Sequence, residues 1–177
     1  YSHFNPALLW NGYSIYLFIQ LPINPFMPYS SSDDYCIVSN HGIAEVRQRK
    51  INQQNALFSL SEFFPGEVVA DFSAGTISAE PTYLTVQLGK RKHITLQPDF
   101  LQYINHSCEP NVFFDTTLMK LVALKPISSN EELVFFYPST EWKMEQGFHC
   151  YCGNSNCLGE IRGAYFVPKQ ILKQYRL

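Results

Sequence analysis

Hydrophobic and polar residues alternate along several short stretches of the chain, and turn residues separate these stretches from one another. Alternation with a period of two is typical of half-buried β-strands. Helical periodicity is scarce, and only residues 168–175, which start with a proline, predict a short terminal helix. The pattern therefore predicts a mainly β protein with short helices and several small sheets. The predicted strands are residues 67–72, 83–88, 93–96, 112–114, 118–124 and 133–137.

The first forty residues follow a different pattern. Pro22, Pro25 and Pro28 are followed by a serine- and aspartate-rich run at 30–34, which is a loop signal. Aromatic residues are also frequent in this segment. We therefore predict that residues 1–40 form an N-terminal extension that packs on the core.

Composition and charge restrict the possible function classes. The chain has 177 residues, of which 46% are hydrophobic and 16% charged, so it can bury a core and is not a disordered protein. The net charge of −2 argues against binding to nucleic-acid phosphates. The most apolar stretch, residues 7–21, is interrupted by polar residues and is too short to span a bilayer. We expect a soluble intracellular protein, nuclear or cytoplasmic, with no membrane association and no direct nucleic-acid binding.

Five cysteines suggest a metal site. Three of them form a C-x-C-x4-C cluster, and an odd total with a tight cluster favours reduced thiols over a disulfide framework. Structural zinc takes four ligands, so a fourth must come from elsewhere in the chain. By spacing alone, Cys108 in the polar loop 105–111 and the adjacent His149 are both candidates, whereas Cys36 is predicted to be a core thiol. The clustered cysteines are Cys150, Cys152 and Cys157.

Two further motifs precede this cluster. Residues 105–111 are NHSCEPN, and residues 132–137 are ELVFFY. Their order and spacing, with LFS at 57–59 and FPGEVV at 64–69, resemble those of the SET-domain protein-lysine methyltransferases followed by a post-SET zinc loop. The resemblance implies a β-clip-like fold of small curved sheets with a knot-like C-terminal threading. It also implies a SET domain at 41–142, a post-SET loop at 147–163 and a C-terminal helix at 164–177.

The resemblance also implies a site. Tyr137 would be the catalytic tyrosine, Tyr83 would line the channel for the substrate lysine, and Phe135 would influence how many methyl groups are added, favouring di- or trimethylation. The substrate would be a lysine of a protein or peptide, such as a histone tail. One structural Zn²⁺ would be held by Cys108 and the three clustered cysteines. The methyl donor S-adenosyl-L-methionine would contact Asn55, Ala56, Leu57, Asn105, His106, Tyr137, Phe148 and Leu158.

Two departures from the family pattern suggest an alternative. Gln54-Asn55-Ala56 stand where the family has glycines that let the backbone approach the cofactor, and Phe136 stands where an acidic residue is common. A catalytically inactive, zinc-stabilised protein-binding module is therefore a competing hypothesis. A zinc-ribbon nucleic-acid binder is a third, which the net charge disfavours. The presence of Asn105, His106 and Tyr137 together favours the enzyme.

Overall fold

The computed structural model describes residues 34–175, and most of the predicted N-terminal extension lies outside this range. Within the range, short strands form five small sheets, and helical structure is limited to short segments, which confirms the predicted fold class. No helix in residues 34–175 is long and apolar enough to cross a membrane. The knot-like threading stays a prediction. The strands are β1 (Tyr35–Asn40), β2 (Ala44–Arg49), β3 (Asn55–Ser59), β4 (Val68–Asp71), β5 (Ser73–Ser78), β6 (Val86–Gly89), β7 (Lys92–Gln97), β8 (Asn105–His106), β9 (Val112–Asp115), β10 (Lys120–Ala123), β11 (Val134–Phe135), β12 (Phe148–His149) and β13 (Glu160–Ile161).

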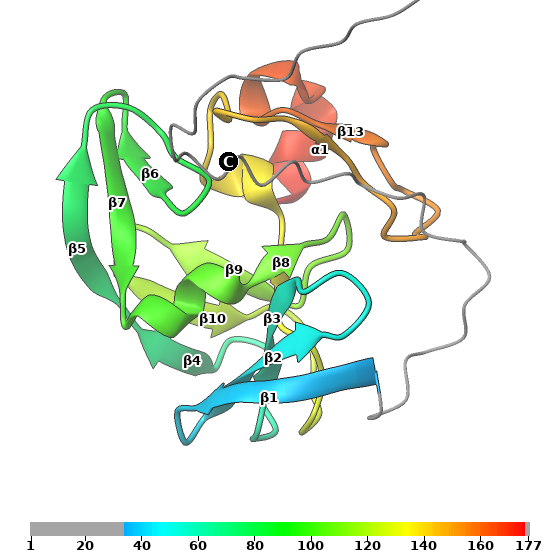
Figure 1. The fold of residues 1–177 in the computed structure, drawn as a ribbon. Coiled ribbons are helices and arrows are strands. Elements are labelled where there is room, and N and C mark those ends of the chain that lie inside the picture. The colour runs from blue at the N-terminus through cyan, green and yellow to red at the C-terminus, as the bar shows by residue number, and fades with distance from the viewer. Residues whose placement is uncertain (1–33, 176–177) are drawn as a thin grey trace, which may run out of the picture.

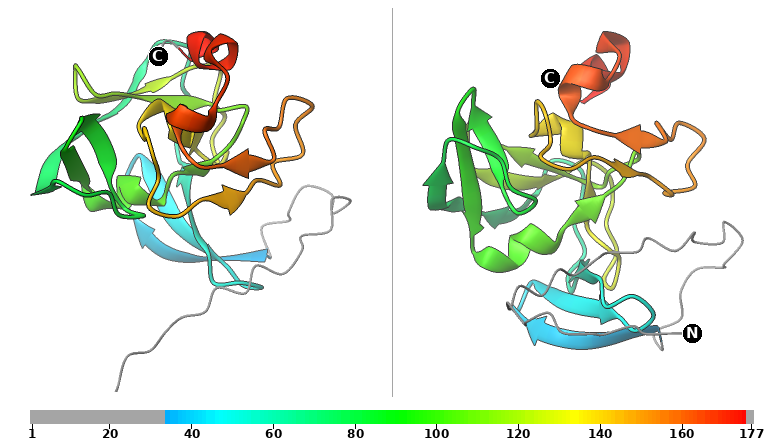
Figure 2. Two further views of the ribbon diagram at one scale, coloured as in Figure 1. Left: turned by 90° about the horizontal axis from the view of Figure 1, so that it is seen from above. Right: turned by 45° about the horizontal axis from the view of Figure 1, so that its top comes forward.

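Three of the five sheets contain three strands each. The sheets have the orders β1-β2-β3, β4-β10-β9 and β5-β7-β6, and all their neighbouring strands are antiparallel. In Figure 1 the first sheet lies at the bottom and the β5-β7-β6 sheet at the left, with β8 between them. In Figure 1 and in the right view of Figure 2, the C-terminal segment, with β12, β13 and the helix α1 (Lys169–Gln174), lies on the opposite side of the molecule from β1.

Local sequence signals gave two correct hairpins, but three predicted strands are shorter or shifted. The β9–β10 and β6–β7 hairpins and the helix α1 confirm the predicted elements. The strand predicted at 118–124 is limited to Lys120–Ala123, and the strand predicted at 133–137 is limited to Val134–Phe135, because a 3-10 turn begins at Tyr137.

The predicted strand at 83–88 instead begins at Val86. Thr82 and Thr85 close a turn over Tyr83 and Leu84, because the Thr85 amide donates to the Thr82 carbonyl and the Thr82 amide donates to the Thr85 hydroxyl. Local hydrogen bonds therefore replace the ladder in this part of the segment.

The two sequence motifs meet in a parallel pair of strands. Asn105 of β8 lies opposite Val134 of β11, and His106 lies opposite Phe135. Parallel pairing joins segments that are distant in the chain and cannot be made by a tight turn. The pair therefore fixes NHSCEPN directly beside ELVFFY.

Asn111 holds these two segments together from the other end of the motif. Its side chain is 1% exposed, and its amide donates to the Glu131 carboxylate and to the Glu132 carbonyl. Its side-chain oxygen accepts a bond from the Val134 amide at 2.8 Å. A buried amide is stable only when its donors and acceptor are paired, so this asparagine acts as a fully bonded cross-link.

The C-terminal segment packs tightly on the core at Gly163. This glycine has a φ of +107°, and a Cβ built on it would lie 2.7 Å from the Trp142 carbonyl oxygen. The next two amides, of Ala164 and Tyr165, donate to the carbonyls of Glu141 and Trp142. Only glycine allows this close approach and conformation together.

Cys36 was expected in the core and is instead exposed. It lies on β1, an edge strand in which Ile37 and Val38 are also more than half exposed. An edge strand pairs on one side only, so it packs less of its surface against other elements. The prediction of a core thiol was therefore wrong.

A buried His–Glu pair links the β5-β7-β6 sheet to the segment after Tyr137. His93 Nδ1 lies 3.8 Å from a carboxylate oxygen of Glu141, and both side chains are less than one tenth exposed. No hydrogen-bond partner among residues 34–175 satisfies His93 Nδ1 or either Glu141 oxygen. Burial raises the pKa of Glu141 to about 8, although the Gln87 backbone partly opposes this, and burial lowers the pKa of His93.

These shifts predict a pH-dependent stability. Between pH 6.5 and 8 the folded protein holds a proton on Glu141 that the unfolded chain has lost, so its free energy of unfolding falls as the pH rises. His93 contributes in the opposite direction only below about pH 6.5, where unfolded histidines are protonated. Between pH 6.5 and 8, the free energy of unfolding of the wild type should fall by about 1 kcal/mol relative to that of Glu141→Gln. Urea unfolding at saturating zinc would measure this, and parallel pH profiles for the two proteins would contradict it.

Candidate active site and metal centre

Four cysteine thiols converge on one point. The Sγ atoms of Cys108, Cys150, Cys152 and Cys157 all lie within 4.8 Å of one another. A zinc ion with four sulfur ligands at 2.3 Å requires sulfur–sulfur separations of about 3.8 Å, so the cluster fits a tetrahedral site. The four thiols are free. His149, the alternative fourth ligand, is exposed and its ring packs beside Tyr151.

The surroundings of the thiols differ. Burial raises the pKa of Cys108 to about 11 and also raises the pKa of Cys150. Burial also acts to raise the pKa of Cys152, but hydrogen bonds from the backbone of Asn154 and Cys108 outweigh it and lower the pKa to about 7. Zinc binds thiolates, so occupancy of this site would release protons from the buried thiols.

His106 connects the thiol cluster to Tyr137. Its Nδ1 accepts a hydrogen bond from the Tyr137 amide at 3.2 Å, and its Nε2 lies 3.5 Å from Cys108 Sγ. Burial lowers the pKa of His106 to about 4, partly opposed by the Phe135 backbone, so the ring is neutral at pH 7. Because Nδ1 is the acceptor, the single ring proton lies on Nε2 and points to the sulfur. The imidazole therefore bridges the cluster and the backbone of Tyr137.

Tyr137 lies in a pocket of aromatic rings. Its ring centroid is 4.7 Å from that of Phe135 and 5.2 Å from that of His106, and its hydroxyl donates to the Ile104 carbonyl. Burial, and then the charge of Glu132, raise the pKa of Tyr137 above its usual value. The phenol is therefore neutral, and its oxygen keeps lone pairs that can accept a further hydrogen bond.

Asn105 joins three segments of the chain. Its side-chain amide donates to the Asn55 carbonyl at 3.1 Å and to the Glu132 carboxylate at 2.9 Å. Burial raises the pKa of Glu132, while the bond from Asn105 and the charge of Arg49 lower it. This contact brings the start of β3, NHSCEPN and ELVFFY to a single point.

Two of the residues that stand in place of the family's glycines, Asn55 and Ala56, lie in β3. The Asn55 side chain accepts a hydrogen bond from Gln48 on β2, and the side chains of Ala56 and Leu57 are buried. Ala56 and Leu57 can therefore reach a ligand only through their backbone.

An apolar surface adjoins the thiol cluster. Phe148 lies 5.6 Å from the His106 ring and 5.9 Å from the Tyr137 ring, and Leu158 packs on the same cluster. Both are only partly buried. Flat rings beside an accessible apolar surface suit a planar aromatic ligand such as adenine.

Tyr83 lies apart from these rings. It is 83% exposed on the turn before β6, and the rings in contact with Tyr137 in residues 34–175 come from Phe135, His106 and Phe148. Its place in a lysine channel stays a prediction.

Comparison with known proteins identifies the family. The model of the SET domain matches residues 32–138, which is more than half of the chain. The chain belongs to the SET-domain family. The match begins just before β1, and it ends at the residue after Tyr137.

Three known proteins illustrate the similarity of this SET domain to others. Methyltransferase flvH of Aspergillus flavus is 40% identical over 63% of the chain and 64% of its own length. The H3 lysine-36-specific histone-lysine N-methyltransferase of Chaetomium globosum is 38% identical over 35% of the chain and 8% of its own length. A humanized mutant of the Chaetomium thermophilum Polycomb Repressive Complex 2, bound to the inhibitor GSK126, matches with a TM-score of 0.42 and 16% identity, over 74% of this chain and 21% of that chain. The chain thus spans less than two thirds of the length of these relatives.

Glu132, the first residue of the ELVFFY motif, has a structural role that its place in the motif does not by itself reveal. In this SET domain Glu132 is the partner of Asn105 and lies close enough to Tyr137 to raise its pKa. A carboxylate that directly precedes the apolar run LVFFY was the available signal, because a charged residue at a strand entrance is buried only when it is paired.

The thiol cluster predicts one zinc ion per chain that depends on Cys108. Cys108→Ser replaces a buried ligand and should weaken zinc binding by more than about 100-fold, since loss of an outer-shell partner alone costs 10–100-fold. Metal content by inductively coupled plasma mass spectrometry, with chelator competition, would measure this. Cys36→Ser is the matched control and should keep one zinc, because Cys36 is exposed and outside the cluster. Equal zinc retention by both variants would contradict the assignment.

Proposed function

We propose that the protein is an S-adenosylmethionine-dependent protein-lysine N-methyltransferase. The observation that carries the proposal is the convergence of Asn105, His106 and Tyr137 beside the four-thiol cluster. Relatives described as methyltransferases, several of them specific for H3 lysine 36, support this chemistry and suggest a histone tail as one substrate. A lysine in a non-histone protein fits the site equally well.

The residues around Asn105 fit the methyl donor. When bound, S-adenosylmethionine supplies a methyl group on a cationic sulfonium. The backbone of residues 55–57, the neutral His106 and the apolar surface of Phe148 and Leu158 would hold it. Burial raises the pKa of Glu132, so its carboxyl group is shielded from water near this site. When ionised, this group would attract a nearby cation such as the sulfonium.

The substrate amine must be neutral to act as a nucleophile. A free lysine has a pKa near 10.4, so its deprotonation at pH 7 costs about 4.6 kcal/mol. The apolar walls formed by Phe135 and Tyr137 disfavour the ammonium form and so lower this cost. The Tyr137 hydroxyl donates its hydrogen bond to the Ile104 carbonyl. Its oxygen can therefore accept a hydrogen bond from the amine and orient the amine. No protein base is needed, because the amine can lose its proton to water before it enters.

The zinc site is structural in this scheme. Four thiolates complete a tetrahedral shell and leave no open position for a substrate. The role of Cys108 is then to keep His106 in place, and the role of His106 is to hold the backbone of Tyr137.

Tyr137→Phe tests the catalytic role. Loss of the hydroxyl should reduce the rate of methyl transfer by about 100-fold, since removal of one oriented hydrogen-bonding group at a reacting centre typically has this effect. The affinity for S-adenosylmethionine should change little, because the ring remains. Transfer of a labelled methyl group to histone tails and to a lysine peptide library would measure the rate, and calorimetry the affinity. A variant as active as the wild type would remove Tyr137 from catalysis.

Phe135→Tyr tests the number of methyl groups added. Phe135 is 8% exposed and lies against both Tyr137 and Phe114. An added hydroxyl would occupy space and hold water near the amine, so the variant should stop at fewer methyl groups than the wild type. Mass spectra after exhaustive reaction should show di- or trimethyl product for the wild type and mainly monomethyl product for the variant. Monomethyl product alone from the wild type would contradict the prediction.

A further inference from the structure

The helix α1 has no strong anchor of its own. It contains six residues, none of which is buried. An isolated helix of this length is not stable in water. Tyr175, the residue that follows α1, makes the contacts that tie it to the site.

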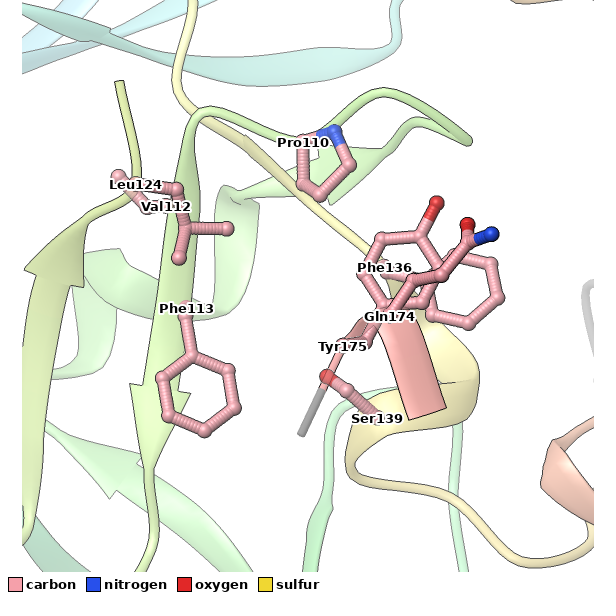
Figure 3. Close-up of a pocket in the computed structure, with 8 residues that line it drawn as sticks. All are labelled: Pro110, Val112, Phe113, Leu124, Phe136, Ser139, Gln174 and Tyr175. Atoms are coloured by element: carbon pink, nitrogen blue, oxygen red, sulfur yellow. The ribbon is translucent and has the colours of Figure 1, made fainter. Parts of the chain in front are cut away.

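Tyr175 touches both motifs at once. Its hydroxyl donates to the Cys108 carbonyl at 2.7 Å, and its ring stacks on Phe136 with centroids 4.1 Å apart and an interplanar angle of 15°. Figure 3 shows the two rings side by side, across a small cavity of about 60 Å³ from Pro110 and Val112. The contact therefore links the residue before Tyr137 with a ligand of the thiol cluster.

These two anchor points are the immediate neighbours of functional groups. Cys108 Sγ lies 3.5 Å from His106 Nε2, and Phe136 directly precedes Tyr137. Phe136 stands where the family commonly carries an acidic residue. Because its ring is only 2% exposed, it requires an apolar partner. Tyr175 supplies that partner from this chain's own C-terminal segment.

We propose that Tyr175 is a positioning residue that holds Cys108 and Phe136 in place. Through them it stabilises the metal cluster and fixes the positions of His106 and Tyr137. The hydroxyl restrains the Cys108 backbone, which Asn156 also restrains through its side-chain amide at 3.2 Å. The ring restrains Phe136. The catalytic consequence rests on the proposed methyltransferase function, whereas the consequence for zinc does not.

Two variants of Tyr175 separate its two contacts. Tyr175→Phe keeps the stacked ring and removes the hydrogen bond, which should speed zinc release to a chelator by about 2–10-fold. Tyr175→Ala also removes the stack and should speed release several-fold more. The dissociation constant for S-adenosylmethionine should rise in the same order. Tyr165→Ala is the control, because Tyr165 is half-exposed in the same segment and contacts Trp142 and Phe166 instead.

Zinc release from the fully zinc-loaded proteins is the primary readout. Release that quickens from wild type to Tyr175→Phe to Tyr175→Ala, with Tyr165→Ala at the wild-type rate, supports the proposal. Wild-type rates in both Tyr175 variants overturn it, and so does equally fast release from Tyr165→Ala, since that would indicate a general loosening of the segment. If the order holds for zinc while the wild type transfers no methyl group, the proposed enzyme function fails and the structural role of Tyr175 stands.

Discussion

The structure depends on one convergence of thiols, the proposed metal cross-link, in which Cys108 of the NHSCEPN loop meets the three cysteines that follow the SET domain. About forty residues separate Cys108 from Cys150, and the post-SET strands β12 and β13 contain only two residues each. Such short strands cannot fix a segment by their own hydrogen bonds. A metal ion bound by the four thiolates would provide this restraint, and its binding energy would then become folding energy for the segment.

The same cross-link sets the polar network of the site. His106 lies between the Cys108 sulfur and the Tyr137 amide, and Asn105 lies between Asn55 and Glu132. The Asn105 side-chain nitrogen and both His106 ring nitrogens thus have defined partners. Buried polar networks of this kind are rigid when they are fully bonded. Rigidity is what methyl transfer needs, because positioning accounts for much of the rate of an in-line displacement.

Local signals in the sequence predicted the local parts of the structure. The turn residues gave the β9–β10 hairpin, and the C-x-C-x4-C spacing gave three of the four thiols that converge in the cluster. The strands β2 and β3 were harder to predict, because their buried residues are consecutive rather than alternating. A period of two does not detect such strands.

Contacts between distant segments were not accessible from pattern alone. The parallel pairing of β8 with β11 and the bond from Asn105 to Glu132 join residues 27 or more positions apart. The stack of Tyr175 on Phe136 joins the end of the described chain to the residue between β11 and Tyr137. Only the family resemblance, which relates the motifs to one another, placed Asn105, His106 and Tyr137 at one site. The resemblance did not predict the role of Tyr175, because this residue lies outside the motifs that carry it.

Isothermal titration of S-adenosylmethionine into the zinc-loaded protein tests the central claim most directly. The account predicts saturable binding that weakens at least about 10-fold in Asn105→Ala, since that change breaks two partly buried hydrogen bonds, one of them to a carboxylate. Asn40→Ala, a change at an exposed position on β1, should bind like the wild type. Equal binding by Asn105→Ala and the wild type, or no binding by the zinc-loaded wild type, would contradict the claim that this network and its metal cluster form a methyl-donor site.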